Sequence, residues 1–160
     1  MALAEDTFRN LLRNMGLIRQ VMDPYFARHG ISGPQWGVLR CLLRAEEDGL
    51  SGLRLSEIGE RMLIRAPSVT GAIDRLERQG LVARVADPKD LRARRVQLTA
   101  TGRALHARVL AGHSQQIEAL MAGLNTEEQA TFARLLDQLA GHLSAMAGAG
   151  SRDGDRKTVK

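Results

Sequence analysis

The stretch SVTGAIDRLERQGLVARVADPKDLRARRVQLT, residues 68–99, decides the fold. Its first part has the spacing of an amphipathic helix, and Gly80 ends that pattern. The apolar face of this helix carries Val69, Ile73 and Leu76. Two β-prone runs with alternating apolar residues follow, at 81–86 and 95–98, and a cation-rich turn separates them. The stretch therefore predicts a helix that leads directly into a two-stranded hairpin.

The residues before this stretch predict a second, shorter helix. Ser56 is expected to cap it, and Pro67 lies in the first turn of the helix that follows. Two short helices separated by a few residues are typical of a helix-turn-helix, in which the second helix is the recognition helix. We therefore place the recognition helix at about 66–79, the hairpin, or wing, at about 82–98, and a very short strand at 53–55.

Apolar residues at helical spacing flank this middle region on both sides. Their stripes are longer than one small domain can cover, which indicates a helical dimer interface. The fold class is therefore mainly α (α+β): a winged helix-turn-helix domain with N- and C-terminal helices that form a helical dimerisation region. The expected divisions are an N-terminal dimerisation helix at 1–32, the winged helix-turn-helix domain at 33–100, C-terminal dimerisation helices at 101–147 and a disordered tail at 148–160.

Arginine dominates the charge of the chain. The 160 residues carry a formal net charge of +5, and lysine occurs only at 89, 157 and 160. A guanidinium fork matches phosphates and carboxylates better than an ammonium group does, so this composition favours an anionic partner. A solvated, arginine-rich surface explains the composition equally well, and composition alone does not separate the two interpretations.

The sequence shows little sign of export, membrane insertion or catalysis. Cys41 is the only cysteine, which excludes an internal disulfide and is typical of a reducing cytoplasm. The N-terminus lacks a basic start, and no apolar run approaches the roughly 20 residues of a membrane helix. No catalytic set of side chains stands out. We expect a cytoplasmic protein that has no cofactor, makes no membrane contact and is not an enzyme.

The segment DPKDLRARRVQLTATGRAL, residues 87–105, resembles the wing signature of the MarR (multiple-antibiotic-resistance regulator) family. That signature reads Asp, any residue, Arg, a few residues, and then Val-x-Leu-Thr-x-x-Gly. Its positions are filled here by Asp90, Arg92, Val96, Leu98, Thr99 and Gly102. The segment SVTGAIDRLERQGLVAR, residues 68–84, is similar to the family's recognition helix and the start of its wing. The resemblance covers roughly residues 5–147 in the same order of elements.

The resemblance implies a homodimeric DNA-binding transcriptional regulator, usually a repressor, that is relieved by a small ligand or by oxidation. Peroxide-sensing members use a cysteine in the first helix, which this chain lacks. Cys41 falls in the second helix, where a buried structural thiol and a redox sensor both remain open. The histidines at 29, 106, 113 and 142 form no ligand pair at i, i+4, so no metal site is expected. A module that binds an acidic protein instead of DNA is a further alternative.

Within this interpretation the recognition helix enters the major groove, and its outward side chains meet DNA. The residues assigned to DNA contact are Arg54, Arg65, Ser68, Thr70, Gly71, Arg75, Arg78, Arg92 and Arg94. The alternative for the helical part of this set is an ordinary solvated face. Asp74 and Glu77 are unsuited to DNA, and we expect them to pair with Arg78 or with the wing arginines.

The wing arginines divide into two kinds. Arg92 is placed in the minor groove, because the negative potential of that groove attracts arginine. Asp90 is expected to orient Arg92 through a salt bridge. Arg94 and Arg95 are assigned to phosphate contacts or to intramolecular pairs, and one of the two should point back toward the body of the protein.

The effector site rests on the family resemblance, which implies a pocket between the dimer helices and the DNA-binding domain, often for aromatic carboxylates. We assign Arg13, Arg19 and Trp36 to such an acid. A plain core position for Trp36 and plain surface positions for the two arginines are the alternative. The expected partners are therefore double-stranded DNA, a second copy of the chain and a small-molecule effector, an aromatic acid.

Overall fold

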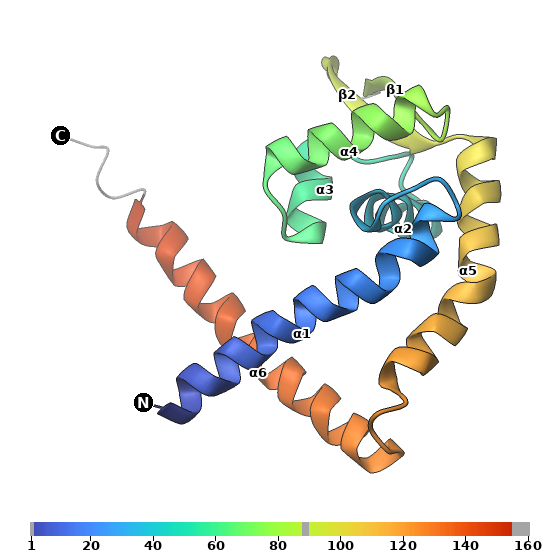
Figure 1. Ribbon diagram of the computed structural model, residues 1–160. Helices are drawn as coiled ribbons and strands as arrows, with labels where there is room; N and C mark the ends of the chain where they lie inside the picture. Colours follow the sequence, from blue (N-terminus) through green and yellow to red (C-terminus); the bar gives the residue numbers. More distant parts are fainter. Residues whose placement is uncertain (1, 88–89, 155–160) are drawn as a thin grey trace. The chain divides into compact units, whose positions relative to one another are not determined.

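The computed structural model describes residues 2–87 and 90–154, and it forms two compact units, the second beginning at Ile117. The elements, in chain order, are α1 (Ala2–Ala27), α2 (Gly33–Glu47), α3 (Leu55–Met62), α4 (Ala66–Arg78), β1 (Val82–Asp87), β2 (Asp90–Leu98), α5 (Ala100–Met121) and α6 (Thr126–Gly154) (Figure 1). This order confirms the mainly helical winged fold. None of the described helices is long and apolar enough to cross a membrane.

The core of the first unit lies where α2, α3 and α4 meet the base of the hairpin. Its most deeply buried side chains include Val38, Leu39, Leu42, Leu53, Ile58, Val69, Ile73, Leu76, Val82, Val96 and Val109. The helix α2 starts at a capping box, in which Ser32 and Gln35 each accept a hydrogen bond from the other's backbone N–H. This capping box determines where α2 begins. The helix then places Trp36 and Leu39 in the core.

The helix α3 departs from the prediction at its N-terminal end. Ser56 does not cap α3. The N-cap is Arg54, whose backbone N–H donates to the Glu57 carboxylate over 2.6 Å. A carboxylate at the third helical position satisfies the free amide directly, so the helix starts before the serine. At its other end α3 stops at Leu63, which adopts a left-handed conformation with a φ of 54°.

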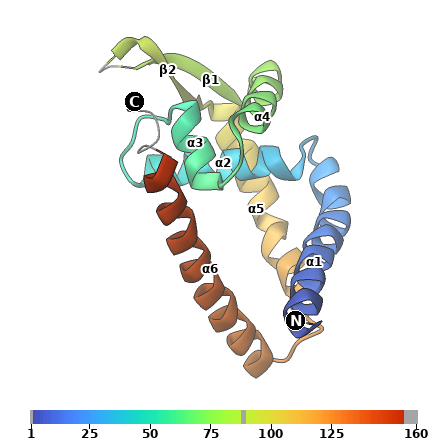
Figure 2. The same cartoon turned by 90° about the vertical axis from the view of Figure 1, so that its left-hand side faces the viewer.

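The hairpin is antiparallel and pairs Val82 with Leu98 and Arg84 with Val96. The short strand expected at 53–55 is reduced to a single bridge between Leu53 and Val96. Gly52 precedes this bridge, with a φ of 98°, and an added Cβ would lie 2.6 Å from the carbonyl oxygen of Val96. The loop therefore approaches the hairpin as closely as only glycine permits. Figure 2 shows the two strands projecting from the helices of this unit.

The apolar residues of the two β-prone runs are largely buried. Leu81, Val82, Val96 and Leu98 are buried, whereas Val85 is only half-buried. Two residues of the cation-rich turn, 88 and 89, lie outside the described residues. The hairpin is thus held at its base by apolar packing, and its charged part extends beyond that packing.

The terminal helices keep long apolar stripes exposed. In α1 only Met22, Tyr25 and Phe26 are buried, while Phe8, Leu12, Met15 and Ile18 are at least half exposed. In the second unit, α6 exposes Phe132, Leu135, Leu136, Leu139, Leu143 and Met146. These are the surfaces that the sequence assigns to dimerisation.

The helix α6 also differs from the prediction at its C-terminal end. It continues to Gly154 and so includes 148–154, which we expected to be disordered, while 155–160 lie outside the described residues. A helix gains one backbone hydrogen bond for each residue added, so it can extend past the end of its apolar stripe. The lack of an apolar stripe in the sequence therefore does not prevent a helical backbone.

Candidate nucleic-acid interface

The helix α4 presents a small, polar outer face. Val69, Ile73 and Leu76 are completely buried, as the spacing predicts. Ala72 is also buried. On the outer face, Ser68, Asp74, Arg75 and Arg78 are exposed, and Thr70 and Gly71 are partly exposed. Arg65 is the exposed N-cap residue and makes no side-chain capping bond. An open face of small residues followed by arginines is what close approach to a nucleic-acid groove requires.

The acidic residues of α4 bind an arginine that the sequence argument did not single out. Arg84 of β1 lies against both, with Nη2 at 2.5 Å from Asp74 Oδ1 and Nη1 hydrogen-bonded to Glu77 Oε2. The hydrogen bond from Asp74 raises the pKa of Arg84. Arg78 donates only to the backbone carbonyl of Asp74, over 3.3 Å. Of the two expected pairings, the one with the Arg78 side chain and an acidic side chain does not form, and the one with a wing arginine is confirmed. The acids connect α4 to β1, the first strand of the wing (Figure 1).

Arg54 and Arg95 converge on Asp87, a carboxylate that is fully buried at the end of β1. Arg54 donates from Nε to Asp87 Oδ2 over 2.8 Å, and this hydrogen bond raises the pKa of the arginine. Arg95 Nε lies 2.9 Å from the same oxygen, while Nη1 donates to the carbonyl of Gly52 over 2.8 Å. Arg95 is thus the wing arginine that points back toward the body. Arg54, assigned to a DNA contact, has its guanidinium engaged within the protein.

Within the described part of the wing, Arg92 and Arg94 are exposed cations. The expected salt bridge from Asp90 to Arg92 does not form. Asp90 Oδ1 instead accepts from the backbone N–H of Arg92 over 3.1 Å, and Oδ2 lies 3.9 Å from Arg54. A short side chain that accepts from the amide two residues on closes a local turn, so Asp90 shapes the backbone under Arg92 and leaves its guanidinium available.

The residues assigned to the effector do not come together within the described chain. Trp36 is buried and stacks on His106 with ring centroids 4.7 Å apart, and Phe26 and His113 surround it. Its indole Nε1 is buried without a hydrogen-bond partner among the described residues. Arg13 and Arg19 are exposed on α1, about 18 and 9 Å along the helix axis from the buried Tyr25.

Two histidines beside Trp36 have lowered pKa values. Burial lowers the pKa of both His106 and His113, and the positive charge of Arg40 lowers each pKa further. Cys41 is the residue that follows Arg40 in α2. Its side chain is half-buried, and this burial raises the pKa of the thiol. Across 2–87 and 90–154, no group of histidine, cysteine and acidic side chains is arranged to hold a metal ion.

The fold and the interface together define a winged helix-turn-helix protein, with an open polar helix beside a basic wing. The sequence pattern of the MarR family matches residues 29–93. The chain is 32% identical to the transcriptional repressor YetL of Bacillus subtilis, an alignment that covers 79% of this chain and 74% of YetL. The protein therefore belongs to the MarR family of transcriptional regulators, which are not enzymes.

Two further relatives inform the search for a ligand. The homoprotocatechuate degradative operon repressor of Escherichia coli is 30% identical over 72% of this chain and 74% of its own length. The solved structure of Bordetella bronchiseptica BpsR, whose DNA binding is regulated by 6-hydroxynicotinic acid, superposes with a TM-score of 0.73. That structure is 26% identical and covers 84% of this chain and 98% of BpsR.

Proposed function

We propose that this protein is a repressor that binds a pseudo-palindromic operator as a homodimer and is released by a small aromatic acid. The observation that carries the proposal is that the arginines in and beside the wing fall into two groups. Arg54 and Arg95 hold the wing through the buried Asp87, and Arg92 and Arg94 remain exposed. A wing that is fixed at its base and cationic beyond it suits insertion into a groove lined by phosphates.

The contacts proposed for DNA follow from the exposed face of α4 and from the exposed arginines of the wing. The N-terminal part of α4, with Arg65, Ser68, Thr70 and Gly71, would enter the major groove, and Arg75 and Arg78 would meet phosphates or base edges. Arg92 would enter the minor groove, and Arg94 would contact the backbone. Arg54 serves as a clamp on the wing, because its guanidinium is bound to Asp87.

Dimerisation is supported by the exposed apolar stripe of α1. A monomer that leaves Phe8, Leu12 and Met15 in water loses the free energy that their burial would provide, about 25 cal/mol for each Å². Two copies related by a two-fold axis would place two recognition helices about one DNA turn apart, about 34 Å.

The aromatic-acid effector is supported by the names of relatives and by the site around Trp36. A buried indole N–H without an acceptor is unfavourable, and the carboxylate or ring oxygen of an aromatic acid would satisfy it. The aromatic rings of Phe26 and Trp36 would stack on the ring of the acid. Arg13 and Arg19 reach such a site only if the partner subunit supplies them, because both lie on the exposed part of α1.

Redox sensing through Cys41 is less well supported. The reactive form of cysteine is the thiolate, and burial raises the pKa of this thiol, so little thiolate is present at neutral pH. A peroxide response that disappears in the Cys41→Ser variant would restore that alternative.

The test is a titration of a fluorescent duplex from the intergenic DNA beside its own gene, over a range of salt concentrations and with salicylate as a probe. We expect tight binding that falls steeply with salt and weakens in salicylate. Duplexes whose half-site spacing is changed by half a turn should bind poorly. No affinity for any duplex would favour a protein-interaction module, and binding that ignores salicylate and related acids would remove the effector part alone.

A further inference from the structure

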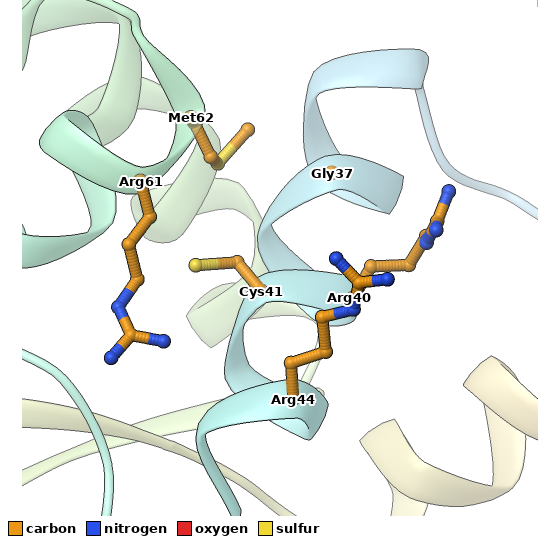
Figure 3. A pocket seen from close by; sticks show the side chains of 6 residues that line it. All are labelled: Gly37, Arg40, Cys41, Arg44, Arg61 and Met62. Atoms are coloured by element: carbon orange, nitrogen blue, oxygen red, sulfur yellow. The ribbon is translucent and has the colours of Figure 1, made fainter. Parts of the chain in front are cut away.

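A cavity of about 390 Å³ lies between α2 and the end of α3, away from the rings around Trp36. Its lining comes from two helices: Gly37, Arg40, Cys41 and Arg44 from α2, and Arg61 and Met62 from α3 (Figure 3). In that view the thiol of Cys41 is turned toward α3, and Met62 extends toward Gly37. All six residues belong to the first compact unit.

The charges around this cavity are of one sign. Three arginines line it, and no acidic residue does. Within the described parts of the chain, the guanidinium groups of Arg40 and Arg44 have no ion-pair partner. Arg61 has one, Asp48, at 3.8 Å, but the Asp48 side chain is 66% exposed and such a surface pair contributes little. Neighbouring cations repel one another, so a bound anion would stabilise this arrangement.

The rest of the lining is apolar. Gly37 is in close contact with Met62, since an added Cβ there would lie 2.6 Å from Met62 Cε. The missing side chain lets the thioether settle against the backbone of α2. Cys41 adds a half-buried thiol to the same wall. A ligand that places a charged group among the arginines would therefore have its uncharged body against Met62 and Cys41.

We propose that this cavity binds a small organic anion, namely a carboxylate with a compact apolar body. The positive charges of Arg40, Arg44 and Arg61 attract the carboxylate from the two helices. The ligand bridges α2 to the helix that precedes the recognition helix. This site is separate from the one around Trp36, and the proposal does not depend on DNA binding.

Cys41 provides a reporter for this one place, because it is the only cysteine of the chain. The quantity measured is the rate of Cys41 alkylation by negatively charged iodoacetate divided by the rate with neutral iodoacetamide. Both reagents react with the thiolate, so the fraction of thiolate cancels in this ratio. We expect the ratio in the full-length protein to exceed that of a short cysteine peptide by about fivefold, the size of one unit-charge contact in water. The Arg44→Gln/Arg61→Gln variant, which keeps only Arg40 of the three arginines, should lower the ratio toward the peptide value.

Ligand binding is measured by protection of Cys41 from iodoacetamide, with benzoate, acetate and inorganic phosphate as probes. Benzoate should slow alkylation at millimolar concentration, and acetate and phosphate should do so far less. The double variant should lose this protection, and Arg108→Gln, an exposed arginine on α5, should retain it. An iodoacetate preference no larger than that of the peptide, equal protection by phosphate, or protection that survives in the double variant would each overturn the proposal. No DNA is present, so failure of the operator titration is a separate result.

Discussion

Arg54 and Asp87 connect the start of α3 to the end of the first wing strand, with Arg54 Nε 2.8 Å from Asp87 Oδ2. The carboxylate is fully buried, whereas the arginine side chain remains 40% exposed. Arg95 approaches the same carboxylate oxygen from β2. One buried anion therefore holds two cations, and the orientation of the wing relative to the helix-turn-helix depends on it.

Asp87→Asn should destabilise the protein by about 2 kcal/mol. Breaking a buried ion pair typically costs about 3–5 kcal/mol, and the value is reduced here because Arg54 keeps part of its hydration. Chemical denaturation measures the loss. Asp90→Asn is the matched control: its carboxylate is 48% exposed and lies 3.9 Å from Arg54, so its loss should stay below about 0.5 kcal/mol. Equal losses for the two variants would contradict a special role for Asp87.

Arg84→Ala should weaken operator binding without changing its salt dependence. Arg84 is bound to Asp74 and Glu77, so it positions the wing against α4 and leaves phosphate contacts to other arginines. Its loss should lower affinity several-fold through a less ordered wing, while the slope of log affinity against log salt stays constant. A double-mutant cycle with Asp74→Asn should give a coupling of about 0.5 kcal/mol, since both side chains are partly exposed. A slope that flattens by about one unit would show instead that Arg84 contacts DNA.

The parts of this protein that follow local periodicity could be predicted from the sequence. Apolar residues recur at helical spacing in α4 and at strand spacing in the wing. The burial of Val69 and Ile73 in α4 and of Val96 in β2 could therefore be predicted from the sequence. The spacing also indicates which residues face outward. For that reason the exposed positions of Arg75 and Arg92 were predictable.

The partners of the charged residues could not be predicted in the same way. Arg84 and Arg92 look alike in the sequence, and only the pairing of β1 with β2 beside α4 brings Arg84 to Asp74. The Arg54 and Asp87 pair joins residues that are distant in the chain, which no local pattern records. Ser56 misled the assignment of the helix start because a glutamate can satisfy the same free amide.

Acid should destabilise the protein through His106 and His113. Burial, together with Arg40, lowers the pKa of both below the ordinary value of 6.5, so the unfolded chain binds more protons. Stability should therefore decline as the pH falls below about 6.5, by at most about 1.4 kcal/mol per pH unit for each histidine. Urea unfolding at pH 7.5 and 5.5 measures this decline. His106→Gln should reduce it, and His142→Gln, at an exposed site on α6, should leave it unchanged.

Arg92→Ala and Arg94→Ala should each flatten the salt dependence of operator binding. A cation that contacts a phosphate releases about one counterion, so each variant should reduce the slope by about one unit. Arg108→Ala, an exposed arginine on α5, should leave the slope unchanged and controls for net charge. Flattening by the same amount in all three variants would indicate a general charge effect and no specific contact by the wing.

Leu63→Gly should stabilise the protein. Leu63 ends α3 with a φ of 54°, and its side chain is 92% exposed, so the residue carries left-handed strain and gains almost no burial. A non-glycine residue in this conformation destabilises the folded state by about 1–2 kcal/mol, and glycine removes this strain. Glycine also raises the conformational entropy of the unfolded chain, which offsets part of the gain in stability. We expect a net gain of about 0.5–1 kcal/mol, seen as a higher melting temperature. Leu63→Ala keeps the strain and should change stability by less than about 0.5 kcal/mol. A gain of equal size in both variants would mean that removal of the exposed side chain is responsible, and that the left-handed backbone at this turn costs little.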